Sequence, residues 1–271
     1  MTKDFTIGFL GCGSIAECIM RGILNSGFAT SDKIYICNRT EASMNRLCEK
    51  YQVHRACATE LVRICDFILI GVKPYDMTGV LDAISEEVTS EKIIVSMAAG
   101  ITLEAIEQQL PPRSKVIRAM PNVSSSVCCG STCVVQNKEV TANDTLMVVE
   151  LFNSVGKAVV LPESTMHGFI ALCGSSPAYV FLFIEALSDG AVRLGIPRQL
   201  SYELASQAVL GAAKMLQESG QGPAQLKDLV CSPGGTTIEA LSTLEKGAFR
   251  SLVIEAMKDC ANKSKRMEIH E

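Results

Sequence analysis

The first 162 residues alternate short apolar runs with amphipathic segments, and this alternation constrains the fold more than any other feature of the chain. Runs rich in β-branched residues that alternate with helical periodicity are typical of a parallel sheet with crossover helices. The runs lack a clean polar–apolar alternation, which predicts strands buried on both faces. We expect strands at Thr6–Leu10, Lys33–Cys37, Phe67–Gly71, Ile93–Met97, Lys115–Ala119, Cys133–Gln136 and Ala158–Leu161.

The pattern changes after Pro162, because no β-rich run of convincing length follows. Helical periodicity predicts consecutive helices near residues 164–173, 177–194, 197–218, 224–230, 236–245 and 247–267. We therefore expect two domains, an α/β domain at residues 1–162 and an all-helical domain at residues 163–271.

A glycine-rich turn follows the first expected strand and leads into a helix. It reads Gly11, Cys12, Gly13, Ser14, Ile15, Ala16. In a G-x-G-x-x-A turn, Gly11 permits the tight bend, Gly13 lets a pyrophosphate approach the backbone, and Ala16 allows close helix–strand packing. Since a second strand comes at the expected distance, the motif predicts a Rossmann-type dinucleotide-binding domain with these six residues at the cofactor.

The end of the second expected strand indicates which dinucleotide binds. Asn38, Arg39 and Thr40 stand where an NAD-dependent protein normally has an acidic residue for the ribose hydroxyls. A guanidinium pairs bidentately with a 2′-phosphate, and the two neutral side chains add hydrogen bonds. We predict NADPH as the preferred cofactor over NADH; the alternative is that Arg39 is an ordinary exposed loop charge.

Three further loops follow strands at their carboxyl ends, the edge at which open α/β sheets bind ligands. Their residues Val72, Lys73, Pro74, Ala98, Ala99 and Asn122 are expected to line the nicotinamide. Lys73 contacts cofactor or substrate in this interpretation, and is a simple loop residue in the alternative one.

A second glycine-rich stretch, Ser232-Pro233-Gly234-Gly235-Thr236-Thr237, interrupts the helical half and starts a new helix. Glycines allow a ligand close to the backbone, and the first N–H groups of a helix attract anions. The stretch predicts an anion site; a helix–helix turn capped by Thr236 or Thr237 is the alternative.

Several classes are disfavoured by composition. A net charge of −4 without a long basic cluster argues against nucleic acid, and no cysteine–histidine spacing is that of a metal site. The twelve scattered cysteines indicate small buried side chains in a reducing compartment, and the N-terminus shows no targeting pattern, so we expect a cytoplasmic protein.

The apolar stretch 169–187 is long enough to raise the question of a membrane span, but Gly174-Ser175-Ser176-Pro177 interrupts it. We expect it to be buried in an oligomer instead.

Taken in order and spacing, the motifs of this chain resemble the pyrroline-5-carboxylate reductase family over nearly the whole length. The matching stretches are the glycine-rich turn, Val72-Lys73-Pro74, Ala98-Ala99-Gly100, Gly174 to Tyr179, and Leu226 to Leu241 with the second glycine-rich stretch inside it. The resemblance implies that NADPH delivers hydride to the imine carbon of 1-pyrroline-5-carboxylate and yields L-proline. It also implies homodimers through the helical domain that assemble further.

The roles of the helical residues follow from this resemblance together with the anion site. Ser232, Gly234, Gly235, Thr236 and Thr237 are expected to hold the substrate carboxylate. Thr237, together with Ser176 or a bound water, is expected to hydrogen-bond the imine nitrogen. Two departures from the family are Ala58, where an Asn often reaches the cofactor, and Cys231, where Ser or Thr is common. The first puts details of cofactor contact in doubt.

Other functions remain open from the residues alone. A β-hydroxyacid dehydrogenase also joins a Rossmann domain to a helical one, but its catalytic lysine would fall at Val180, and no lysine occurs between Lys157 and Lys214. A related imine reductase with another cyclic substrate and a non-catalytic NADP-binding sensor are the remaining alternatives.

Overall fold

The computed structural model describes residues 5–268, and their contacts form two compact units. The first unit contains residues 5–175 together with 260–268, and the second contains residues 176–259. The predicted domain boundaries at residues 1–162 and 163–271 stay a prediction about function, because these contacts describe packing only.

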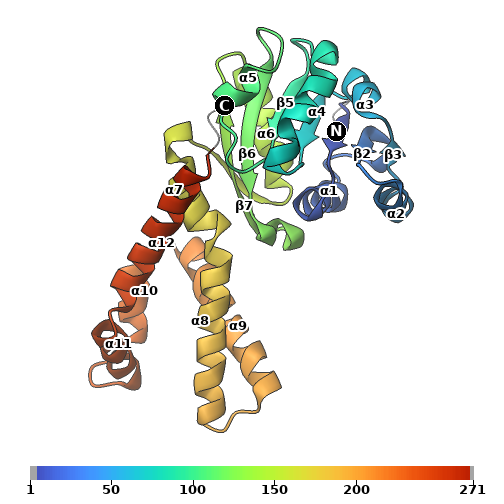
Figure 1. The fold of residues 1–271 in the computed structure, drawn as a ribbon. Helices are drawn as coiled ribbons and strands as arrows, with labels where there is room; N and C mark the ends of the chain where they lie inside the picture. Colours follow the sequence, from blue (N-terminus) through green and yellow to red (C-terminus); the bar gives the residue numbers. More distant parts are fainter. Residues whose placement is uncertain (1–4, 269–271) are drawn as a thin grey trace. The chain divides into compact units, whose positions relative to one another are not determined.

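Within the described residues the first unit contains an eight-stranded sheet with the order β3-β2-β1-β4-β5-β6-β7-β8 (Figure 1). Its strands are β1 Ile7–Leu10, β2 Ile34–Cys37, β3 His54–Arg55, β4 Phe67–Ile70, β5 Ile93–Ser96, β6 Lys115–Pro121, β7 Gly130–Gln136 and β8 Gly156–Val160. The expected α/β fold class is confirmed, and every predicted strand is present. Strands β1, β4 and β5 are buried along their whole length, as their unbroken apolar runs predict.

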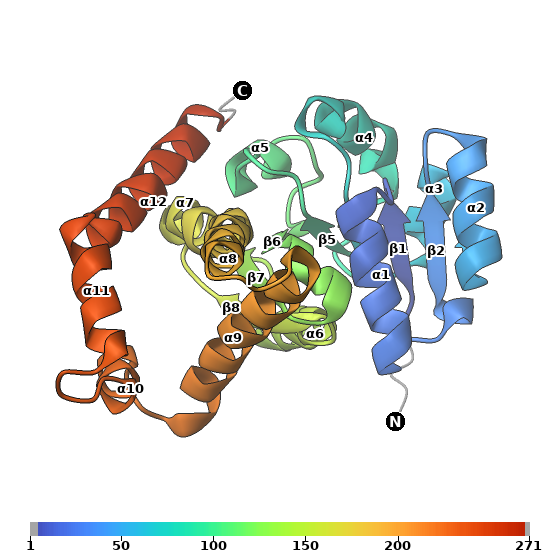
Figure 2. The same ribbon diagram turned by 90° about the horizontal axis from the view of Figure 1, so that it is seen from below.

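Helices cover both faces of this sheet (Figure 2). They are α1 Ser14–Ser26, α2 Glu41–Tyr51, α3 Ala58–Ile64, α4 Met77–Ile84, α5 Leu103–Glu107, α6 Ala142–Asn153 and α7 Met166–Phe169. One apolar core lies between the sheet and helices α1, α2 and α6, and the other lies between the sheet and helices α3, α4, α5 and α7. Side chains such as Ile19 on one face and Leu81 on the other are fully buried.

The sheet differs from the sequence expectation in two places. Strands β6 and β7 pair antiparallel, so the sheet is mixed, not purely parallel. A parallel return needs a crossover of a dozen or more residues, whereas the only element between these strands is the five-residue 3₁₀-helix η4, Val123–Val127, among the described residues. The short edge strand β3 was not expected either, because two exposed polar residues carry no periodic signal.

The second unit is helical, as predicted. Its helices are α8 Ser176–Arg193, α9 Arg198–Ser219, α10 Pro223–Val230, α11 Thr236–Lys246 and α12 Phe249–Arg266, of which α12 continues into the first unit. The segment Glu163–Arg193 is long and apolar enough to cross a membrane by length and composition, and 6% of its most apolar 18 residues is buried. Such a segment is also typical of a core helix whose covering partner is another protein chain.

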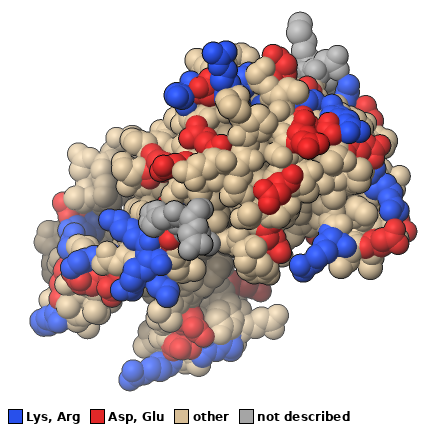
Figure 3. Space-filling model, turned by 45° about the horizontal axis from the view of Figure 1, so that its top comes forward, with Lys and Arg blue, Asp and Glu red and all other residues tan. Residues whose placement is uncertain are grey.

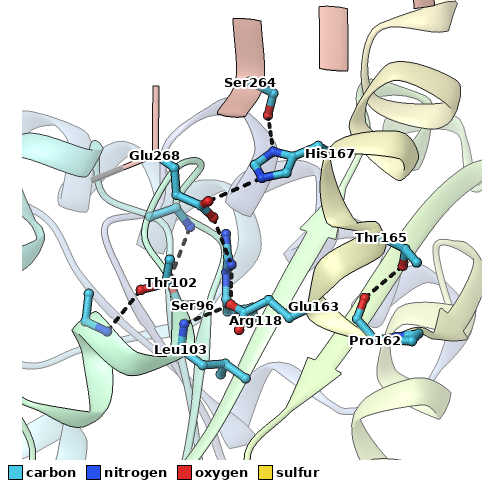
Figure 4. A network of polar contacts seen from close by, with 12 residues as sticks. Ser96, Thr102, Leu103, Arg118, Pro162, Glu163, Thr165, His167, Ser264 and Glu268 are labelled. Atoms are coloured by element: carbon cyan, nitrogen blue, oxygen red, sulfur yellow. Dashed lines mark hydrogen bonds and ion pairs between the residues drawn. The ribbon is translucent and has the colours of Figure 1, made fainter. Parts of the chain in front are cut away.

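The end of α12 is held on the first unit by a polar network around Arg118, a β6 residue that is 3% exposed (Figure 4). The guanidinium pairs with Glu163 and lies 3.6 Å from the Glu268 carboxylate. The His167 ring contacts Glu268 at 3.2 Å and Ser264 at 3.0 Å. Because the buried Arg118 guanidinium has Glu268 as one of its two carboxylate partners, the network fastens residues 264–268 to the sheet.

The cysteines follow the sequence expectation only in part. Among the twelve, Cys12, Cys65 and Cys133 are buried, and the others are half-buried or exposed. None of them forms a disulfide within the described residues.

Candidate active site

The candidate site lies where the strand order reverses, between β1 and β4, at the carboxyl ends of the strands. A cavity of about 610 Å³ opens there. It is lined by Leu10, Gly11, Cys12, Gly13, Cys37, Asn38, Arg39, Thr40, Ser43, Ala58, Gly71, Val72, Lys73, Asp76, Gly79, Val80 and Ala83. The open α/β sheet therefore carries its cavity where such folds bind nucleotides.

The glycine-rich turn has the geometry that a pyrophosphate needs. Gly11 has φ +81°, and a Cβ there would lie 2.5 Å from a Val72 methyl, so only glycine fits. A Cβ on Gly13 would meet no atom within 4 Å, which leaves space beside the backbone. Gly13 is also the N-cap of α1 and supplies no side-chain cap, so the first N–H groups of the helix face an open space. These residues fit a dinucleotide phosphate.

Asn38 holds the turn in place. Its Oδ1 accepts a hydrogen bond from the Cys12 N–H at 2.5 Å, and its Nδ2 donates to Ser43 Oγ at 2.9 Å. The amide thus ties β1 to the start of α2, and its direct contact with the cofactor stays a prediction. Ser43 was not identified from the sequence, because nothing in a helical segment marks one serine as lining a cavity.

Arg39 and Thr40 line the same cavity, as the sequence predicts. The Arg39 side chain is 83% exposed, and its Nη1 lies 3.8 Å from an Asp76 carboxylate oxygen. Thr40 is the N-cap of α2 but forms no side-chain cap bond, so its hydroxyl does not satisfy that helix terminus. The end of β2 thus places a cation and a helix N-terminus together, an arrangement that attracts anions.

Of the predicted cofactor residues, eight line the cavity: Gly11, Cys12, Gly13, Asn38, Arg39, Thr40, Val72 and Lys73. The others lie outside its lining: Ser14, Ile15, Ala16, Pro74, Ala98, Ala99 and Asn122. Ala16 is buried at 2% exposure inside α1, where its small size permits the packing that the motif predicts. The roles of this second group stay predictions.

Two titratable groups beside the turn are strongly perturbed. Burial raises the pKa of the Cys12 thiol to about 12, so this side chain is neutral and unreactive. The Arg46 guanidinium, followed by Lys50 and Tyr51, lowers the pKa of Glu17 to about 2. The Glu17 carboxylate accepts hydrogen bonds from all three and links α1 to α2.

Asn122 lies at the end of β6 and is 7% exposed. Its Oδ1 accepts from the Ser131 N–H at 3.1 Å, and its Nδ2 donates to the Cys173 carbonyl at 2.8 Å. Cys173 belongs to a π-helical turn, η6 Ile170–Gly174, which is separated by Ser175 alone from Ser176 at the start of α8. Isolated π turns of this kind occur frequently at functional sites.

The second unit carries the other predicted motif as a tight turn between α10 and α11. The Gly235 N–H donates to the Ser232 carbonyl at 3.0 Å, and Gly234 has φ +65°, which suits a type II turn with Pro233. The N-cap of α11 is Gly235, so the alternative of a threonine cap is wrong. Thr236 and Thr237 occupy the first helical turn, where their N–H groups lack intrahelical partners.

The rest of the described surface shows no second candidate for the active site. On the face drawn in Figure 3, acidic and basic residues of the described chain are interspersed without a broad field of one sign. No group of three or more potential metal-ligating side chains occurs among residues 5–268. A hollow of about 870 Å³ near Glu104, Arg113 and Lys138 has neither a glycine-rich turn nor an open helix terminus among its described lining residues.

The strand order, the glycine-rich turn and the open terminus of α1 define a dinucleotide-binding protein of the Rossmann class. Comparison with family models agrees, because residues 6–100 match the model described as NADP oxidoreductase, coenzyme F420-dependent. Residues 163–267 match the model for pyrroline-5-carboxylate reductase dimerisation.

Similar proteins narrow the class to one family. The pyrroline-5-carboxylate reductase of Escherichia coli is 43% identical over 262 residues, which cover 96% of this chain and 97% of that protein. The solved structure of a pyrroline-5-carboxylate reductase from Coxiella burnetii has a TM-score of 0.94 at 32% identity, covering 98% of this chain and 100% of that one. The Plasmodium falciparum enzyme, solved with NADP bound, has a TM-score of 0.88 at 31% identity, covering 99% and 100%. The chain belongs to the pyrroline-5-carboxylate reductase family.

Proposed function

We propose that this protein reduces 1-pyrroline-5-carboxylate to L-proline with NADPH, the last step of proline biosynthesis. The observation that best supports this proposal is the cavity between β1 and β4, where the strand order reverses. It contains the glycine-rich turn and Arg39, and the chain belongs to this family. NADPH, when bound, supplies the hydride that the imine carbon accepts. The protein's part is to bind both molecules, orient them and stabilise the charge of the ring.

The cofactor contacts that we propose start at the turn. The N–H groups at Gly13 and Ser14 bind the pyrophosphate, and Arg39 with Thr40 binds the 2′-phosphate. The loops that end β4, β5 and β6 hold the nicotinamide with Val72, Lys73, Pro74, Ala98, Ala99 and Asn122. Asn122 acts there through the Cys173 carbonyl, by fixing the turn before Ser176.

The substrate contacts that we propose come from the second unit. We likewise propose that residues 1–162 bind the cofactor and that residues 163–271 serve dimerisation and substrate binding. The turn Ser232–Gly235 and the N–H groups of Thr236 and Thr237 bind the carboxylate of the ring. The hydroxyl of Thr237, with Ser176, hydrogen-bonds the imine nitrogen. A cyclic imine arrives protonated from water, so the reaction needs no strong general acid.

Substitution of Thr237 tests the assignment. We expect Thr237→Ala to lower kcat on the order of ten- to a thousandfold through loss of one transition-state hydrogen bond, with NADPH affinity unchanged. Thr237→Ser restores the hydroxyl and should recover most of the rate. Thr243→Ala removes an exposed hydroxyl further along α11 and serves as the control. Unchanged kinetics in Thr237→Ala would contradict the role, and NADPH binding without any turnover of pyrroline carboxylate or proline would favour a sensor.

We also propose a cytoplasmic homodimer, assembled through the helical unit into a larger homo-oligomer. Support comes from the match to a dimerisation model, from the exposed apolar side chains of the second unit, and from the unpaired cysteines, which suit a reducing compartment. Light scattering of the purified protein and fractionation of cells test the two parts separately.

A further inference from the structure

Arg39 and Asp76 come from different elements that line the same cavity. Arg39 follows β2, whereas Asp76 ends the 3₁₀-helix η2, Pro74–Asp76, at the start of α4. The Arg39 Nη1 and Asp76 Oδ1 atoms lie 3.8 Å apart, and their side chains are 83% and 37% exposed. The separation is that of a Coulombic pair and exceeds a direct hydrogen bond.

The local chain explains why the Asp76 carboxylate is available. Pro74 fixes the backbone after Lys73, and the Asp76 N–H donates to the Lys73 carbonyl at 3.0 Å, which closes the 3₁₀ turn. Asp76 is the N-cap residue of α4 but makes no side-chain cap bond to it. Its carboxylate lies on the cavity lining instead.

Asp76 differs in charge from the other ionisable residues that line the cavity. Arg39 and Lys73 are its cations, and Asp76 is its sole carboxylate among the described lining residues. Rossmann proteins that use NAD normally carry an acidic residue at the end of β2, where this chain has Asn38-Arg39-Thr40. The carboxylate that is missing from one element is thus supplied by another, beside the guanidinium expected to bind the 2′-phosphate.

We propose that Asp76 is a specificity-determining residue that limits the preference of this enzyme for NADPH over NADH. The inference rests on the proposed placement of the adenosine ribose at Arg39. A carboxylate beside Arg39 competes with the 2′-phosphate for the guanidinium and repels the phosphate dianion. The same carboxylate accepts hydrogen bonds from the free ribose hydroxyls of NADH, which carry no charge.

The test measures binding of NADPH and NADH to the full-length protein by nucleotide fluorescence, and of 2′,5′-ADP by calorimetry. Asp76→Asn keeps the shape and removes the charge, and we expect the ratio of NADPH to NADH affinity to rise about three- to tenfold at low salt. Affinity for 2′,5′-ADP should rise with it, and both gains should shrink at high salt. Asp82→Asn is the matched control, since Asp82 is exposed on α4, the helix that Asp76 precedes, but does not line the cavity.

The outcomes distinguish a failure of the role proposed for Asp76 from a failure of the proposed function. If the wild-type protein binds NADPH and 2′,5′-ADP but Asp76→Asn leaves the ratio within the range of the Asp82→Asn control, the role of Asp76 is overturned. If the wild-type protein binds neither nucleotide, the proposed function falls as well. A rise in 2′,5′-ADP affinity in Asp76→Asn alone supports the inference independently of any catalytic activity.

Discussion

The two units of this chain obtain their stability in opposite ways. The first unit encloses two apolar cores and buries side chains from six of its eight described strands. Among residues 176–259, all of which are described, only Ala205, Ser188 and Ser201 are buried. A helical unit with so little buried surface needs a covering partner, because burial of apolar area is the main favourable term in folding.

Two of the three buried residues of the second unit are polar. The hydroxyls of Ser188 and Ser201 lie 2.6 Å apart, and Arg198 donates to Ser188 at 3.0 Å, which joins α8 to α9. Large apolar side chains stay outside, including Leu182 at 68% exposure and Leu210 at 58%. The hydrogen bonds therefore fix the position of α8 against α9, and the exposed apolar side chains remain available for an interface with another chain.

The largest expected effect is on the buried charge network of the first unit. We expect Arg118→Met to lower the free energy of unfolding by about 3–5 kcal/mol, because it leaves the Glu163 and Glu268 carboxylates without their cation. Arg250→Met removes an exposed ion pair of the second unit and should cost less than about 1 kcal/mol. Urea denaturation measures both, and equal losses would break the contrast between the units.

An intermediate effect is expected on association. We expect Leu210→Asp to raise the dissociation constant of the proposed dimer about ten- to a hundredfold, since it places a charge on the exposed apolar surface of α9. Leu146→Asp is the control, because Leu146 is similarly exposed, at 62%, on α6 of the first unit. Sedimentation at several protein concentrations gives the constants, and a larger effect of Leu146→Asp would reassign the interface.

The smallest effect concerns the link between α1 and α2. Glu17 has a pKa of about 2 in the folded protein against an ordinary value of 4.5, so its ionised form stabilises the fold above pH 4.5. That contribution is lost as the pH falls from 4.5 toward 2, and it should amount to about 1 kcal/mol or less for partly exposed partners. Glu17→Gln should therefore be less stable than wild type at pH 6 and nearly equal to it at pH 2. A stability difference that does not change with pH would contradict this.

Local patterns predicted most of the fold correctly. The seven expected strands and the helices after Pro162 are present. They could be predicted because hydrophobic periodicity and turn residues are local signals, carried by residues within a few positions of one another. Prediction failed where pairing is non-local or the signal is short. The antiparallel return of β7 and the edge strand β3 depend on what neighbours them in the sheet, which no local period records.

The site shows the same division. Gly11, Gly13 and Arg39 were identified because a motif places them at fixed offsets from a strand end. Asp76 and Ser43 line the same cavity without belonging to any motif, and only packing brings them there. The sequence likewise indicated cofactor contact for Asn38, whereas the structure shows its amide engaged with Cys12 and Ser43.

By itself the sequence determined the succession of the seven expected strands, the dinucleotide turn, the absence of an acidic residue from Asn38-Arg39-Thr40 and the family. Those properties reside in contiguous residues, whose conformations follow from periodicity, glycine geometry and helix termini. Tertiary structure decided that the end of α12 packs beside Arg118 and that a carboxylate from η2 lies 3.8 Å from Arg39. Such contacts join residues far apart in the chain, and they form only because the sheet and its two cores bring those residues together.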